Sequence, residues 1–199
     1  AFFPSAAVAW RINEEEFLKQ SEVISNLKLR ASYGSTGNSE IPAYRSLAGL
    51  SNYDVIFSGN RQIGIGTGRM SNSALHWEKT NQYDVGLELG FFNNKLNFEF
   101  DVYRRKVGDM LLDAPLPLSS GYGSIFSNIG SMENKGVEFA VNVLNIGNEQ
   151  FSWSSNFNIS INKNKVIALT GGSDIFSGNT VIREGEPVGS FFGFVHQGT

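Results

Sequence analysis

The chain has 199 residues, of which 18% are charged, and its net charge of -3 is too small to favour a nucleic-acid partner. The charged fraction is lower than the soluble average of about 25%. Cysteine is absent, which excludes a disulfide scaffold, thiolate metal sites and cysteine catalysis, and is typical of a chain exported through an oxidising compartment. The apolar runs are too short for a transmembrane helix, so any membrane span must be built from short alternating strands.

The first part of the chain predicts two strands separated by a short helix. Phe2–Ile12 alternates as a strand. Asn13 is expected to cap a helix whose acidic first turn, Glu14–Glu16, suits the helix dipole. Leu27–Tyr33 is the next alternating strand, and the turn-rich segment Gly34–Asn38 is expected to end it.

Residues 39–74 form the least regular region of the sequence. A strand is expected near Tyr53–Phe57, and Gly59–Gly68 is interpreted as an external loop. The glycines at 64, 66 and 68 resemble part of a nucleotide-binding fingerprint, but the next required glycine position holds Arg69. No strand and helix flank the run in the order that such a site needs, so a flexible surface loop is the favoured interpretation.

From Tyr83 to Ile161 the sequence alternates with period two in four segments. Apolar residues occupy one face of each segment, whereas amides, hydroxyls and carboxylates occupy the other. The apolar positions run through Tyr83–Phe91, Leu96–Val102, Val137–Val143 and Phe151–Ile161. This alternation predicts amphipathic antiparallel strands.

The connections between these segments alternate between short and long. Only residues 92–95 and 147–150 separate the paired segments, as in tight hairpins. Long connections with proline and glycine cover Leu111–Ser127 and the region after Leu169. Short turns at one end and long loops at the other are typical of a bacterial outer-membrane barrel. The fold class predicted is therefore all-β, as part of a large antiparallel transmembrane β-barrel.

Aromatic residues support a membrane wall and also provide candidate ligand contacts. Those near the short turns are expected to form an interfacial girdle, and they are Phe91, Phe92, Phe151 and Trp153, with Trp77 and Tyr83 further along. Tyr103 has the parity of the polar face and does not follow this scheme. The loop aromatics are better candidates for ligand stacking, and they are Tyr44, Tyr53, Tyr122 and Phe126.

The polar faces offer few residues in an arrangement that suggests covalent chemistry. Five acids have polar-face parity: Asp84, Glu88, Glu99, Asp101 and Glu138. A hydrated barrel interior accounts for them better than an acid–base pair does. His76 and His196 lie far apart without metal-ligand spacing. We assign no catalytic, cofactor or metal residue, and the substrate-binding residues are not identified by sequence.

The basic run Arg104–Lys106 has two interpretations. It is able to bind an anionic ligand or the sugar-phosphate surface of an outer leaflet. The favoured interpretation is a strand that emerges beyond the membrane, where its charges are solvated.

Six sequence blocks follow one another along the chain: Leu27–Asn38, Trp77–Leu87, Tyr103–Lys106, Asn128–Phe139, Asn162–Val166 and Glu184–Gly193. In this order they resemble the SusC/RagA-like TonB-linked outer-membrane transporters of Bacteroidetes-type bacteria. The resemblance implies a large barrel with an internal plug, driven through TonB, that imports oligosaccharides or peptides beneath a SusD-like surface lipoprotein. It implies no enzyme activity and no cofactor.

Ala1–Pro4 resembles the start of a strand, and Phe191–Thr199 a strand cut before its turn. We therefore expect residues 1–199 to be an internal barrel segment without the plug domain, the TonB-contacting segment or the barrel ends. Its expected partners are membrane lipid, the lipoprotein and TonB, the last through a region outside this segment. The alternative is a soluble or secreted β-sandwich that binds glycans through its loops, with its apolar faces meeting across a closed core.

Overall fold

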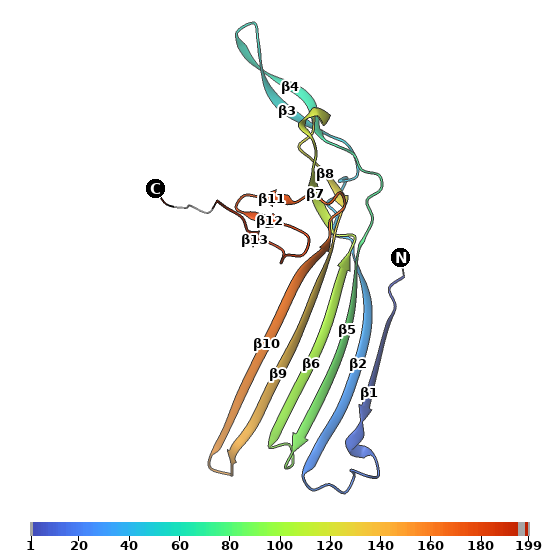
Figure 1. Ribbon diagram of the computed structural model, residues 1–199, viewed down its shortest axis with the longest axis vertical. Coiled ribbons are helices and arrows are strands. Elements are labelled where there is room, and N and C mark those ends of the chain that lie inside the picture. Colours follow the sequence, from blue (N-terminus) through green and yellow to red (C-terminus); the bar gives the residue numbers. More distant parts are fainter. Residues whose placement is uncertain (1, 195–197, 199) are drawn as a thin grey trace. The chain divides into compact units, whose positions relative to one another are not determined.

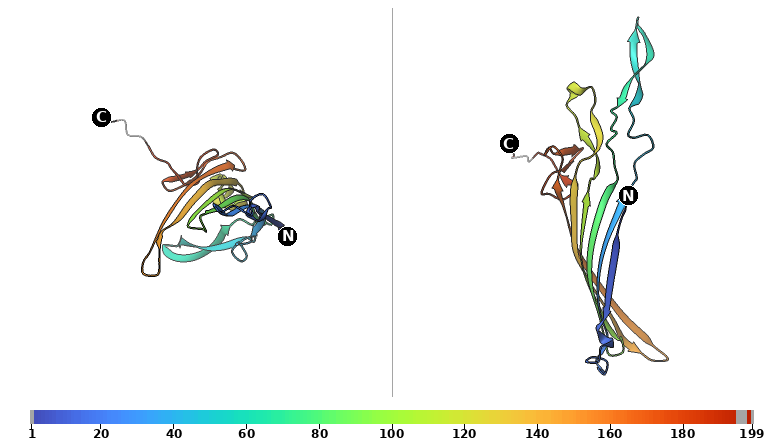
Figure 2. Two further views of the ribbon diagram at one scale, coloured as in Figure 1. Left: turned by 90° about the horizontal axis from the view of Figure 1, so that it is seen from below. Right: turned by 90° about the vertical axis from the view of Figure 1, so that its right-hand side faces the viewer.

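Six long strands form one sheet in the computed structural model, which describes residues 2–194 and residue 198 (Figure 1). The strands are β1 (Ser5–Arg11), β2 (Ile24–Asn38), β5 (Glu78–Phe91), β6 (Leu96–Gly108), β9 (Ser131–Gly147) and β10 (Ser152–Ala168). They lie in the order β1-β2-β5-β6-β9-β10, so each strand pairs with the long strand that precedes it along the chain. Figure 2 shows these strands as a single layer.

The chain divides into two compact units. The first, with Ala1–Thr36, Thr80–Lys106 and Glu133–Asn164, holds most of the long sheet. The second holds the connections after β2, β6 and β10, in Gly37–Lys79, Val107–Met132 and Lys165–Thr199.

The register of β1 and β2 confirms the predicted alternation at the start of the sheet. The two strands pair antiparallel from Ser5 opposite Gly34 to Arg11 opposite Lys28. Trp10 lies opposite Leu29 in this register, so apolar side chains meet across the strands on one face.

Two tight turns join long strands, as the sequence predicts. Between β5 and β6, residues 92–95 turn the chain with Phe92, Asn93 and Asn94 all in the left-handed region, at φ 53°, 56° and 58°. Between β9 and β10 the turn covers residues 148–151, one residue later than predicted. There Asn148 Oδ1 accepts hydrogen bonds from the backbone N–H groups of Gln150 and Phe151, at 3.0 and 2.7 Å.

The prediction of a helix after Asn13 is wrong. The chain forms only a single 3-10 turn, η1 (Ile12–Glu14), and its N-terminal flanking residue is Arg11, without a side-chain cap. Asn13 Oδ1 instead accepts a hydrogen bond from the backbone N–H of Leu27 at 3.3 Å. Asn13 therefore satisfies the incoming strand β2 rather than a helix N-terminus, because the antiparallel return brings that strand alongside it.

The predicted end of the second strand at Gly34 is also wrong. β2 continues to Asn38, and pairing supports the extension because the backbone N–H of Ser35 donates to Pro4 O at 2.9 Å. Small residues in this stretch, such as Gly34, leave open space beside the strand rather than breaking it.

The second unit contains three small sheets where irregular loops were expected. β3 (Gly49–Phe57) pairs with β4 (Asn60–Arg69), so the predicted strand at Tyr53–Phe57 is confirmed and the predicted loop at Gly59–Gly68 is largely a strand. β7 (Leu111–Pro115) pairs with β8 (Ser124–Asn128), and the turn η2 (Leu118–Ser120) lies between them. β11 (Ile175–Ser177), β12 (Thr180–Ile182) and β13 (Ser190–Phe191) form the third sheet. The strand expected over Phe191–Thr199 falls partly outside the described residues.

Buried apolar side chains are confined to the second unit within the described part of the chain. They are Val107, Ile129, Val166, Leu169 and Val181. Val107 and Val166 lie at the ends of β6 and β10 that belong to this unit. The part of the long sheet in the first unit has no buried apolar side chain among the described residues and presents two open faces. None of the helices among the described residues is long and apolar enough to span a membrane.

Candidate functional site on the polar face of the long sheet

The two faces of the long sheet differ sharply in chemistry. On β10 the apolar side chains of Phe157, Ile159 and Ile161 are 59%, 50% and 59% exposed. The alternate positions of the same strand are asparagine and serine. Because successive side chains of a strand point to opposite faces, one face is apolar and open and the other is a continuous hydrogen-bonding surface.

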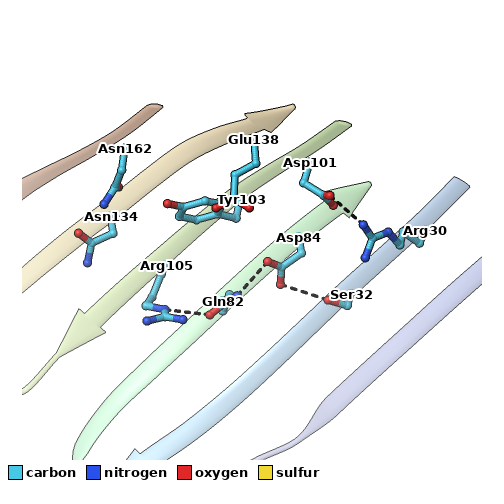
Figure 3. Close-up of a pocket in the computed structure, with 10 residues that line it drawn as sticks. All are labelled: Arg30, Ser32, Gln82, Asp84, Asp101, Tyr103, Arg105, Asn134, Glu138 and Asn162. Carbon is cyan, nitrogen blue, oxygen red and sulfur yellow. Dashed lines mark hydrogen bonds and ion pairs between the residues drawn. The ribbon is translucent and has the colours of Figure 1, made fainter. Parts of the chain in front are cut away.

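The polar face forms a concavity of about 650 Å³ across β2, β5, β6, β9 and β10 (Figure 3). Its lining side chains are Arg30, Ser32, Gln82, Asp84, Asp101, Tyr103, Arg105, Asn134, Glu138 and Asn162. Three of the acids with predicted polar-face parity, Asp84, Asp101 and Glu138, lie in this lining, which confirms the parity assigned to them.

A chain of hydrogen bonds crosses three strands of this face (Figure 3). Arg105 Nε on β6 donates to Gln82 Oε1 on β5 at 2.8 Å. Gln82 Nε2 in turn donates to Asp84 Oδ1 at 2.8 Å. Ser32 Oγ on β2 donates to the other oxygen, Asp84 Oδ2, at 3.1 Å. The Asp84 carboxylate is therefore held in place from two sides.

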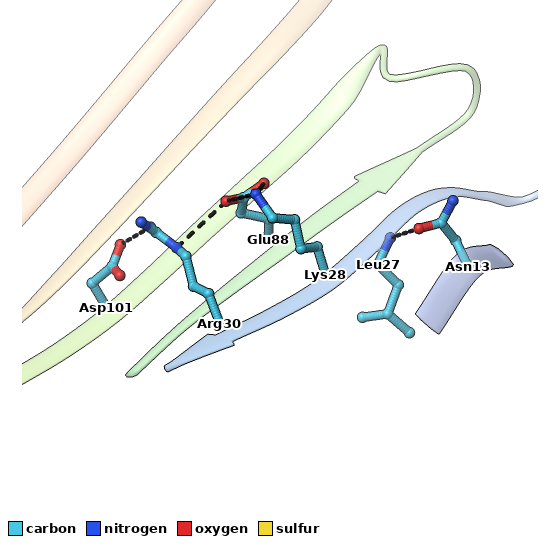
Figure 4. A network of polar contacts seen from close by, with 6 residues as sticks. All are labelled: Asn13, Leu27, Lys28, Arg30, Glu88 and Asp101. Atoms are coloured by element: carbon cyan, nitrogen blue, oxygen red, sulfur yellow. Dashed lines mark hydrogen bonds and ion pairs between the residues drawn. The ribbon is translucent and has the colours of Figure 1, made fainter. Parts of the chain in front are cut away.

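A second cluster centres on Arg30 (Figure 4). Arg30 Nη2 donates to Asp101 Oδ2 at 2.8 Å, and Lys28 Nζ donates to Glu88 Oε1 at 3.2 Å. Arg30 Nε lies 3.4 Å from Glu88 Oε1, but this atom is buried without a well-directed hydrogen bond. The contact is therefore electrostatic rather than a hydrogen bond. The side chains are 26–42% exposed, so solvent screens the pairs and their role is mainly to orient the groups.

The acids that sequence reasoning weighed as an acid–base pair are mostly engaged in these contacts. Asp84, Glu88 and Asp101 each accept from a cation, an amide or a hydroxyl. Glu99 and Glu138 line a smaller concavity of about 240 Å³, together with Asp101. This arrangement can bind a polar ligand through hydrogen bonds and charge.

Tyr103 is the aromatic residue of the polar face, and the structure explains its position. Its ring lies over Gly136 of β9, where an added Cβ would come within 2.6 Å of Tyr103 Cζ. Gly136 therefore provides the space that the ring occupies. Tyr103 offers a stacking surface inside the concavity that sequence reasoning had set aside as an exception, and the glycine on the neighbouring strand was the available indication.

All four loop aromatics belong to the second unit, and two of them line the same concavity. Tyr122 and Phe126 line a concavity of about 310 Å³. Arg45 lies over the Phe126 ring, with Cζ 4.8 Å from its centroid, and donates to Asp113 Oδ1 at 2.8 Å.

The other two loop aromatics do not line this concavity. Tyr53 donates its hydroxyl to Thr67 O at 2.7 Å within its own hairpin, and Tyr44 is 77% exposed.

The histidines do not form a metal site in the described part of the chain, where no group of three or more suitable ligands gathers. His76 Nε2 lies 3.5 Å from Asp109 Oδ2, and His76 Nδ1 lies 2.9 Å from Ala74 O. His196 falls outside the described residues.

Aromatic rings contact one another on the apolar face near the short turns. The ring centroids of Phe91 and Phe98 lie 6.1 Å apart, as do those of Phe98 and Phe139. Further along, the Tyr33 and Tyr83 rings lie 4.9 Å apart, and the Tyr33 hydroxyl donates to Asn81 Oδ1 at 3.2 Å. The tyrosine pair suits a membrane interface, where an apolar ring and a polar tip are needed together, whereas the phenylalanines add only apolar ring surface.

The basic run Arg104–Lys106 is divided between the two faces. Arg105 belongs to the polar face, where it donates to Gln82. Arg104 lies on the opposite face, and its Nε donates to Glu133 Oε2 at 2.7 Å. Lys106 shares the parity of Arg104.

A sheet with one exposed apolar face, one hydrogen-bonding face and long connections after alternate strands defines the wall of a transmembrane β-barrel. The chain belongs to the family described as TonB dependent receptor-like, beta-barrel, which it matches over residues 1–188. This is a family of outer-membrane transport proteins, and the predicted fold class is confirmed.

Relatives of known name are of the SusC/RagA type, as the sequence blocks predicted. TonB-dependent receptor P3 of Formosa agariphila is 42% identical over all of this chain and 21% of its own length. TonB-dependent receptor SusC of Bacteroides thetaiotaomicron is 38% identical over 86% of this chain and 18% of its own. The RagAB peptide transporter structure matches with a TM-score of 0.83 and 33% identity, covering 96% of this chain and 21% of that one. The chain thus spans about a fifth of the relatives it matches.

Proposed function

We propose that this chain forms part of the wall and outer loops of a TonB-dependent nutrient importer, as one segment of a longer barrel. In this proposal the polar face of the long sheet lines the substrate conduit and the apolar face contacts lipid. The observation that carries the proposal is the opposition of these faces on the same strands. Asn162 lines the concavity, whereas its neighbour Ile161 is 59% exposed on the other side.

We favour oligosaccharides as the substrate class. The concavity presents amides, hydroxyls and carboxylates, which suit sugar hydroxyl groups, and Tyr103 adds an aromatic surface for a sugar ring.

Peptides are the second candidate, and two observations favour them. The RagAB match covers nearly the whole chain. The concavity also carries charges of both signs, with Arg30 and Arg105 close to Asp84 and Asp101, which suits a ligand with both an amino and a carboxylate group.

The proposed partners are TonB, through a part of the protein outside these residues, and a SusD-like lipoprotein above the outer loops. The proposed location is the outer membrane of a Bacteroidetes-type bacterium, in keeping with relatives from Formosa and Bacteroides. The segment performs no covalent chemistry in this proposal, because its acids serve to hold the wall and to contact substrate.

The soluble β-sandwich alternative is disfavoured. It requires the apolar faces to meet across a closed core, yet Phe157 remains 59% exposed and the buried apolar residues of the described chain lie in the other unit. Membership of the barrel family opposes it as well.

Uptake by the full-length protein tests the proposal. Cells lacking the gene would be complemented with the wild type, with Tyr103→Ala on the polar face, or with Val102→Ala on the apolar face as the matched control. Labelled oligosaccharides and oligopeptides would be offered with and without a protonophore. We expect protonophore-sensitive uptake of oligosaccharides that Tyr103→Ala lowers and Val102→Ala preserves. Absence of energy-dependent uptake of both substrate classes would contradict the proposal.

A further inference from the structure

The apolar face of the long sheet changes character abruptly near the long connections. On β6 the last apolar residue of that face, Val102, is followed two positions later by Arg104 and then Lys106. On β10, Ile161 is followed in the same way by Lys163. β9 runs in the opposite direction, and there Lys135 precedes Val137. Three neighbouring strands therefore pass from apolar to cationic at the same end of the sheet.

We call the side chains of Arg104, Lys106, Glu133, Lys135 and Lys163 the basic belt. All five have the parity of the apolar face, because their immediate neighbours in the sequence line the concavity on the other face. These neighbours are Tyr103, Arg105, Asn134 and Asn162. All five lie within the first unit. The belt carries a formal net charge of +3.

Three of the four cations of the belt have no carboxylate partner among the described residues, in contrast to the cations of the polar face. On the polar face Lys28 and Arg105 each contact an acceptor on the neighbouring strand β5, and Arg30 reaches across β5 to Asp101 on β6.

In the belt, Glu133 is engaged by Arg104 and has a side chain only 12% exposed. Lys106, Lys135 and Lys163 are exposed, and within the described part of the chain their ammonium groups have no carboxylate partner. Glu133 is also the only acid of this parity among the described long strands.

We propose that the basic belt binds the phosphate groups of anionic lipids in the outer leaflet of the membrane. This inference rests on the proposed function, which places the long connections outside the cell and the apolar face in lipid. Two residues along a strand advance the chain by about 7 Å, so the ammonium groups lie just beyond the apolar band, at headgroup depth. The aliphatic stems of lysine extend along the apolar surface while the charged ends reach phosphate.

Lipid binding by the full-length protein tests this inference. The probe is bis-phosphorylated lipid A, titrated into purified transporter in detergent and followed by native mass spectrometry, with phosphate-free lipid A beside it. Each cation near an anionic lipid surface contributes about fivefold in affinity. The triple variant Lys106→Gln, Lys135→Gln, Lys163→Gln should therefore bind the phosphorylated lipid about 100-fold more weakly, with the phosphate-free lipid unaffected.

A matched control removes three cations at the other end of the sheet, with Arg11→Gln, Lys19→Gln and Lys95→Gln. These side chains are exposed near the short turns, and the control should bind lipid A within about twofold of the wild type. Should the triple belt variant fail to insert, Lys163→Gln alone is expected to lower the affinity about fivefold.

Three results would overturn the assignment: unchanged affinity of the belt variants, an equal loss in the control, or full displacement of lipid A by inorganic phosphate at matched concentration. Fractionation and uptake assays on the same strains separate this from the broader proposal. A wild-type protein that sits in the outer membrane and imports substrate but ignores lipid phosphate would refute the belt alone.

Discussion

Replacing Val141 with arginine is the sharpest test of which face meets lipid. Val141 lies on the apolar face of β9, between the polar positions Lys135 and Asn145. Ten residues of strand span about 34 Å, and a tilt of about 40° projects them onto about 26 Å, close to the apolar band of about 25 Å in such barrels. Val141 is one residue from the centre of this span and so lies within about 3 Å of the midplane.

An arginine near the midplane on the lipid face should destabilise the folded barrel by about 2–4 kcal/mol. This corresponds to about 30- to 900-fold in the folding equilibrium. Asn142→Arg is the matched control, because Asn142 lies at nearly the same depth on the polar face, and it should cost little. Val137→Arg lies nearer the band edge and should fall in between.

Urea unfolding of the full-length protein in lipid vesicles, followed by gel mobility and tryptophan fluorescence, would measure the three differences. Equal losses for Val141→Arg and Asn142→Arg would refute the assignment of the faces. A larger loss for Asn142→Arg would indicate that the two faces had been exchanged.

Three further substitutions test local features in the full-length protein by the same unfolding measurement. Gly136→Ala should cost about 1–3 kcal/mol, because its Cβ would collide with a tyrosine ring and a neighbouring backbone carbonyl, whereas Gly34→Ala, with open space around it, should cost far less. Asn94→Val should cost about 1–2 kcal/mol because Asn94 has φ 58°, and Asn94→Gly should be tolerated; equal effects would contradict the turn geometry. Hydrogen bonds from Arg183 lower the pKa of the Asp174 carboxyl in the folded protein. The ionised carboxylate therefore stabilises the fold at any pH above the pKa that Asp174 has in the unfolded chain. This stabilisation is lost as the pH falls through the lower pKa of the folded state. Asp174→Asn should therefore be less stable than the wild type at pH 7 and match it in strong acid, and a difference independent of pH would refute this.

The long strands were predictable from sequence because successive side chains face alternately an apolar and an aqueous environment. Alternation alone placed Leu96–Val102 in β6, and the turn at residues 92–95 was predicted at the correct residues. The opposing parity of Asp101 and Val102 likewise followed from the period of a strand. The polar-face contacts, such as Arg105 to Gln82, were not predictable, because they depend on the register between strands, which alternation does not fix.

The errors of prediction have a common physical origin in pairing with another strand. Asn13 has the sequence features of a helix cap, but its amide serves the returning strand at Leu27. Gly59–Gly68 has the composition of a loop, yet its isoleucines alternate with glycines that lie close against the β3 side chains. An added Cβ at Gly66 would approach the Tyr53 ring to 2.9 Å, so glycine here makes room for a partner. Local composition cannot reveal a partner that arrives from elsewhere in the chain.

The division of Arg104–Lys106 between two faces restricts how the length of this chain can change. A single residue inserted into β6 before Arg104 would turn every later side chain of that strand to the other face, moving Arg105 to the apolar face and Lys106 to the polar face. A two-residue insertion would preserve the faces and only shift their depth. Single-residue insertions and deletions among natural variants should therefore concentrate in the connections between paired strands, where no alternation has to be maintained. The long strands should change length by even numbers.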